Sequence, residues 1–113
     1  MKKLLFINCC IRSKSRTEKL CRDYLDIIKS ESDFELQELF VPSLHLMPID
    51  RAALEQRDAD TRNQLLHTES YRLAHDFASA DAIVIAAPYW DASFPSMLKV
   101  YFEHICVNKI TLG

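Results

Sequence analysis

Glycine is almost missing from this chain of 113 residues, whose single glycine is the last residue, Gly113. The glycine-rich G-x-G-x-x-G turn of dinucleotide-binding proteins and the Walker A loop both need glycine inside the chain, so both are excluded. If the protein binds a phosphate, a loop of another kind must hold it.

The chain also lacks an excess of positive charge and lacks long apolar runs. Its formal net charge is -2, which gives no indication of a nucleic-acid or membrane-surface partner. No apolar stretch approaches the roughly 20 residues that a membrane-spanning helix needs. The apolar start of the chain stops at Asn8, with Arg12 close behind, which is too short for a secretory signal. We therefore interpret it as the first buried strand of a cytoplasmic protein.

The four cysteines show none of the spacings typical of a metal site. They have no C-x-x-C pair, and Cys9 and Cys10 are adjacent, so that on a strand they would point to opposite faces. We interpret all four, which include Cys21 and Cys106, as reduced thiols that act as small packing residues.

Apolar periodicity predicts three strands that alternate with three main helices. The expected strands are 3–9, 34–41 and 82–87, and the expected helices are 17–30, 61–80 and 95–106. Pro42 and Pro48 mark the segment 42–60 as a surface excursion, with a short helix from Arg51. A β-α-β-α-β-α order predicts a single α/β domain with a parallel sheet and right-handed crossovers.

Two loops carry the residues of chemical interest. The first, residues 10–17, combines hydroxyls and cations and leads into a helix N-terminus, where exposed N–H groups favour an anion. An ordinary helix cap in a solvated loop would look similar.

The second loop, residues 88–95, contains the only tryptophan, Trp90, beside Tyr89, Asp91 and Phe94. Aromatic side chains of this density suit a flat heteroaromatic ligand, although they could equally cap the core. Both loops follow strands of a parallel sheet, so they are expected at the same edge, where open α/β sheets bind ligands.

Residues 8–17, together with the A-A-P-Y-W-D run at 86–91 and F-P-S-M-L-K at 94–99, resemble the flavodoxin-like FMN-dependent NAD(P)H oxidoreductases. That group includes the azoreductases and quinone reductases. The resemblance implies a three-layer α/β/α fold with strand order 2-1-3, FMN (or FAD) as cofactor, NAD(P)H as electron donor and a small quinone-type or azo-type electron acceptor. It also implies a homodimer.

The same resemblance implies which residues bind the cofactor. By this comparison Cys10, Ser15, Arg16 and Thr17 would hold the FMN phosphate, while Pro88, Tyr89, Trp90 and Asp91 would lie along the isoalloxazine ring. It implies no catalytic acid or base, because the flavin carries out the redox chemistry.

Residues 1–113 would then form a single flavodoxin-like domain that lacks the family's carboxyl-terminal strands four and five. In the order 2-1-3 the third strand becomes an edge, yet Ile83, Val84 and Ile85 carry none of the charges or prolines that protect edges. The pattern predicts a central strand, so either the chain is a shortened form or a partner covers this edge. A non-catalytic remnant that dimerises and binds flavin weakly or not at all is therefore the alternative function.

A phosphatase of the low-molecular-weight type is a third hypothesis. Cys10 and Arg16 satisfy its C-x5-R spacing. No glycine lies between them to let backbone amides turn inward around an oxyanion, which disfavours this hypothesis.

Overall fold

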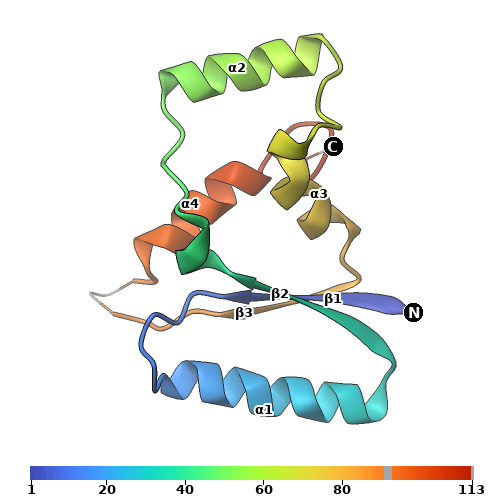
Figure 1. Cartoon of the computed structure of the whole chain (residues 1–113), viewed down its shortest axis with the longest axis vertical. Helices are drawn as coiled ribbons and strands as arrows, with labels where there is room; N and C mark the ends of the chain where they lie inside the picture. Colours follow the sequence, from blue (N-terminus) through green and yellow to red (C-terminus); the bar gives the residue numbers. More distant parts are fainter. Residues whose placement is uncertain (91–92, 113) are drawn as a thin grey trace.

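Three parallel strands form the central layer, in the order β2-β1-β3. The computed structural model describes residues 1–90 and 93–112. In it β1 (Lys2–Asn8) pairs with β2 (Phe34–Phe40) on one side and with β3 (Ala82–Ala86) on the other. Helix α1 (Arg16–Glu31) covers one face of the sheet, and α3 (Arg72–Ser79) and α4 (Ser96–Ile105) cover the other (Figure 1). The predicted α/β class, the parallel sheet and the 2-1-3 order are confirmed.

Strand β1 is the centre of the core because both of its faces are buried. Leu4 and Phe6 pack with Leu25 of α1, while Leu5 and Ile7 pack on the other face of the sheet. A run of consecutive apolar residues, here Leu4 to Ile7, is typical of a parallel sheet covered on both faces. Because β1 is the middle strand, its carboxyl end lies between the ends of β2 and β3, and the exposed loop after it begins there.

Helix α1 begins where a serine caps it. The Ser15 hydroxyl accepts a hydrogen bond from the Glu18 N–H at 3.1 Å, the usual role of serine at an N-cap. Leu25 is buried, and Cys21 and Ile28 pack beside it. The other apolar residues of the helix are exposed, so its apolar face is wider than the part that contacts the sheet.

Helix α4 closes the opposite face with Leu98, Tyr101 and Ile105, which pack against Leu5 and Ile7. Pro95, which we expected at the first helical position, instead precedes the helix as its N-cap.

The helix predicted over 61–80 is wrong. Thr61 and Arg62 end α2 (Arg51–Arg62), and Gln64 adopts a left-handed backbone with φ 59°. A turn and the short 3-10 helix η2 (Glu69–Tyr71) then lead into α3. A left-handed residue cannot continue an α-helix, so residues 61–80 do not form one helix. The helix expected from Arg51 is confirmed as α2, which begins at that residue.

Helix α2 stands apart from the sheet and has no buried residue (Figure 1). Another 3-10 helix, η1 (Val41–Leu44), precedes α2 in the chain. Arg57 joins it to the body, because its guanidinium donates to the carbonyl oxygens of Glu103 at 3.1 Å and Cys106 at 3.3 Å. The Glu103 carboxylate accepts from the Ile49 N–H at 3.0 Å.

The cysteines are free thiols in three different environments. Cys9 and Cys10 are buried in clusters on opposite faces of the sheet, and burial raises the pKa of the Cys9 thiol to about 11. Cys21 is half-buried, but Cys106 is exposed, so a packing role for Cys106 is wrong. Among the described residues no group of three or more potential metal ligands occurs.

No helix within residues 1–90 and 93–112 combines the length and apolar character needed to cross a membrane.

Candidate functional site

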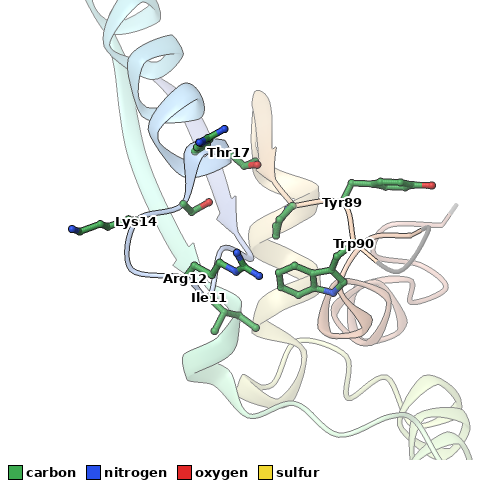
Figure 2. A pocket seen from close by; sticks show the side chains of 9 residues that line it. Ile11, Arg12, Lys14, Thr17, Tyr89 and Trp90 are labelled. Atoms are coloured by element: carbon green, nitrogen blue, oxygen red, sulfur yellow. The ribbon is translucent and has the colours of Figure 1, made fainter.

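A cavity of about 430 Å³ opens where β1 and β3 end. Its wall comes from the loop after β1, the first residues of α1 and the loop after β3 (Figure 2). The lining residues are Ile11, Arg12, Lys14, Ser15, Arg16, Thr17, Pro88, Tyr89 and Trp90.

One wall of the cavity is the N-terminus of α1. The first backbone bond of the helix runs from the Lys19 N–H to the Ser15 carbonyl, at 3.1 Å. The N–H groups of Arg16 and Thr17 precede that bond and so have no partner within the helix. Together with the positive end of the helix dipole and the nearby guanidinium groups, this wall favours an anion.

The opposite wall is aromatic. Trp90 is held by two reciprocal backbone bonds with Ser93, at 2.8 and 2.9 Å. Figure 2 shows its indole facing Arg12 across the cavity, whereas the ring of Tyr89 points away from it. Tyr89 instead packs edge to face with Phe94, with ring centroids 5.7 Å apart. Of the aromatic residues in this loop, Trp90 is therefore the one placed to contact a ligand with its ring.

The structure brings together six of the eight residues that the resemblance singled out. Ser15, Arg16, Thr17, Pro88, Tyr89 and Trp90 all line the cavity. Cys10 does not, because it is buried below the loop. Asp91 lies outside the described residues.

Three lining residues and one supporting residue were not in the predicted set. Ile11, Arg12 and Lys14 line the cavity, and the two cations were visible in the sequence as part of a basic loop. Asn8 is buried, and its side-chain oxygen accepts from the Cys10 N–H at 2.9 Å. An asparagine that ends a buried strand was the available signal for a residue that shapes the following turn.

A parallel sheet in this order, with its cavity at the carboxyl ends of neighbouring strands, defines a flavodoxin-like α/β protein. The comparison with protein families agrees, since the flavodoxin-like fold family matches residues 2–113. The chain belongs to that family.

Curated relatives are longer than this chain. The alignment with "FMN-dependent NADH:quinone oxidoreductase 2" of Clostridium perfringens (strain 13) has 28% identity over 118 residues and covers 98% of the chain and 58% of the relative. A similar oxidoreductase of Clostridium botulinum (strain Alaska E43) is 32% identical over 125 residues, again with 58% of the relative covered. The chain thus spans somewhat more than half the length of these relatives.

Solved structures show the same fold. The structure of an azoreductase from Bacillus anthracis (Sterne) matches with a TM-score of 0.81 at 18% identity and covers 97% of this chain and 58% of that one. An FMN-dependent NADH-azoreductase from Bacillus anthracis (Ames Ancestor), solved in complex with FMN, matches with a TM-score of 0.76 at 21% identity, with 97% and 58% covered.

Proposed function

We propose that the protein binds FMN in the cavity at the ends of β1 and β3. The phosphate would lie at the N-terminus of α1, beside Ser15, Arg16 and Thr17. The isoalloxazine ring would lie along Pro88, Tyr89 and Trp90, with the Trp90 indole as its apolar wall. The observation that carries this proposal is that a single cavity has a cationic helix N-terminus on one side and an indole on the other.

The residues present fit this group in charge and size. A phosphate monoester carries close to two negative charges at neutral pH, and Arg12 and Arg16 both line the cavity. The cavity volume, about 430 Å³, lies within the range of roughly 300 to 1,000 Å³ that small-molecule sites occupy. Cys10 would contribute through the backbone of its loop, because its side chain is buried.

The activity we propose is NADH oxidation coupled to reduction of a quinone-type or azo-type acceptor. Bound FMN would supply the hydride chemistry, and the residues of this chain would bind and orient it. The support is that curated relatives are named FMN-dependent NADH:quinone oxidoreductases. Because the chain spans 58% of those relatives, binding and turnover must be tested separately.

The binding test compares two flavins. FMN added to the purified protein should show shifted absorbance and quenched fluorescence on titration, and riboflavin, which lacks the phosphate, should bind more weakly. Arg16→Ala should weaken binding of FMN but not of riboflavin, while Lys19→Ala, which removes an exposed cation outside the cavity, serves as the matched control. If FMN is not bound at all, the flavoprotein proposal is wrong for this chain.

The activity test follows with NADH, the FMN-loaded protein and a soluble quinone. Oxidation of NADH that depends on both protein and quinone would support the reductase. Bound FMN without turnover would instead favour the non-catalytic alternative.

A further inference from the structure

The side chain of Arg12 is directed into the cavity, toward the indole of Trp90 (Figure 2). Lys14 belongs to the same loop and also contributes to the cavity wall, but Figure 2 shows its side chain pointing away. Both residues are exposed. Of these two cations, Arg12 is therefore the one whose charge faces the aromatic wall.

The loop that carries Arg12 is held at both ends. On the strand side, the Cys10 N–H donates to the side-chain oxygen of Asn8 at 2.9 Å, and Cys10 itself is buried. On the helix side, the Ser15 hydroxyl caps α1. Residues 11–14 join these two anchors. The backbone of Arg12 is thus fixed in place even though its side chain is exposed.

The charges that line the cavity are all of one sign. Within residues 1–90 and 93–112, the lining contains Arg12, Lys14 and Arg16 and no carboxylate. Arg12 forms no ion pair within these ranges, whereas Arg22 pairs with two glutamates at 2.8 Å each. Among the described residues, the guanidinium of Arg12 is therefore open to a ligand.

The two arginines of the cavity lie at different ends of the proposed ligand. Arg16 is the first residue of α1, so its charge adds to the helix N-terminus, where we place the phosphate. Arg12 faces Trp90, where we place the isoalloxazine ring. A guanidinium is planar and stacks on aromatic rings. Arg12 and Trp90 are thus arranged to enclose a flat ring between them.

A positive charge at this position distinguishes the two oxidation states of such a ring. Hydride transfer from NADH moves two electrons and one proton to the ring, and NADH becomes NAD⁺. The oxidised ring is neutral, whereas the reduced ring carries one negative charge near neutral pH. A cation beside the ring therefore attracts the reduced form more strongly than the oxidised form.

We propose that Arg12 sets the redox potential of the bound flavin. Its guanidinium contacts the ring opposite Trp90 and stabilises the reduced, anionic form. Tighter binding of the reduced form raises the midpoint potential by thermodynamic linkage, so Arg12 makes the bound flavin easier to reduce. This inference rests on the proposed flavin function and adds a role for a residue outside the phosphate site.

The test is the two-electron midpoint potential of the flavin bound to the whole chain, measured without oxygen against a reference dye and at saturating flavin. This measurement needs no turnover. Loss of a charge-assisted contact weakens binding by about tenfold or more. Arg12→Gln should therefore lower the potential by about 30 mV, which equals a tenfold loss of preference for the reduced form in a two-electron couple.

Two further variants separate the charge of Arg12 from the general charge of the loop. Arg12→Lys keeps the positive charge and should recover part of the loss. Lys14→Gln is the matched control, because it removes the same charge from a side chain that points away from the cavity (Figure 2). It should shift the potential much less than Arg12→Gln does.

Riboflavin separates a contact with the ring from a contact with the phosphate, because it has the same ring and no phosphate. If Arg12 contacts the ring, Arg12→Gln lowers the potential of bound riboflavin as much as that of bound FMN. If Arg12 instead pairs with the phosphate, the variant weakens FMN binding and leaves the potential of bound riboflavin unchanged, and the inference is overturned.

The remaining outcomes distinguish this inference from the function on which it rests. An unchanged potential in Arg12→Gln, or an equal shift in Lys14→Gln, overturns the role of Arg12 but leaves flavin binding intact. Wild-type protein that binds neither FMN nor riboflavin overturns the proposed function, and the role of Arg12 with it.

Discussion

The thiol of Cys10 donates to the carbonyl oxygen of Ala86, with sulfur and oxygen 3.7 Å apart. Ala86 ends β3 and Cys10 follows β1, so this contact joins the two strand ends below the cavity. Cys10 does not line the cavity, whereas Arg16 does. A cysteine nucleophile needs access to its substrate, and Cys10 has only 2% of its surface exposed, which argues against the phosphatase hypothesis.

We therefore expect no hydrolysis of p-nitrophenyl phosphate above background. The measurement is the release of nitrophenolate by the wild-type protein and by Cys10→Ser. Hydrolysis that disappears in Cys10→Ser would show that the loop opens to expose the thiol and would revive the phosphatase hypothesis.

Trp90→Ala should weaken binding of both FMN and riboflavin while leaving the melting temperature nearly unchanged. Stacking of a flat ring on an aromatic side chain contributes about 1 to 3 kcal/mol, which corresponds to roughly 5-fold to 150-fold in dissociation constant. Flavin fluorescence quenching measures the binding. Phe94→Ala is the control, because Phe94 lies outside the cavity lining. Parallel losses of stability and binding in Trp90→Ala would show that Trp90 is a core residue.

Ser15→Ala should lower the free energy of unfolding by about 1 kcal/mol, because it removes the side-chain acceptor that caps α1. Urea denaturation followed by circular dichroism measures the change. Ser13→Ala alters an exposed serine in the same loop and should have no comparable effect. Equal stability of the two variants would mean that the cap contributes nothing.

Tyr101→Phe should stabilise the protein. Tyr101 is fully buried, and within the described residues its hydroxyl has no hydrogen-bond partner. Burial also raises the pKa of this phenol, so it stays neutral. Removing a buried polar group that lacks a partner recovers about 1 kcal/mol or more of desolvation cost. Thermal melts of the two proteins check the sign, and a lower melting temperature in Tyr101→Phe would reveal an unseen partner, such as a buried water.

Glu38 should make the fold sensitive to acid. Hydrogen bonds from Arg22 lower the pKa of the Glu38 carboxyl, so the stabilisation is complete above the unfolded pKa of about 4.3. It is lost as the pH falls through the lower pKa of the folded state. The pair is partly exposed, and such pairs contribute about 1 kcal/mol or less. The melting temperatures of wild type and Glu38→Gln should differ at pH 7 and converge as the pH falls below the folded-state pKa of Glu38. A constant difference across this range would contradict the stabilising role of the Glu38 carboxylate.

The strands and the start of α1 could be predicted because local signals and tertiary packing agree there. Leu4, Phe6 and Val84 belong to short apolar runs that indicate buried strands. Ser15 is a residue type that often caps the start of a helix. The break at Gln64 could not be predicted in this way. Gln64 has a left-handed backbone there, but no glycine or proline in the sequence signals the break. The apolar spacing typical of a helix also continues across it.

The site was predicted in outline, because residues that follow parallel strands must meet at one edge of the sheet. Periodicity could not tell that Cys10 would face inward and Arg12 would line the cavity. The turn after β1 includes a hydrogen bond from the Cys10 N–H to the Asn8 side chain, and apolar periodicity carries no signal for it. Apolar periodicity also could not distinguish Leu25 from Tyr24. Both belong to the same apolar pattern, but Leu25 packs against the sheet while Tyr24 is exposed.

Helix α2 has no buried residue, and this has a dynamic consequence. Its attachment depends on a few hydrogen bonds, chiefly those of Arg57, so it can unfold locally without exposing the core. Segments of this kind exchange their amide hydrogens through low-energy openings, well below the free energy of global unfolding. Residues 51–62 would then become accessible to proteases before the core unfolds, while the cavity, which has no lining residue from α2, stays formed.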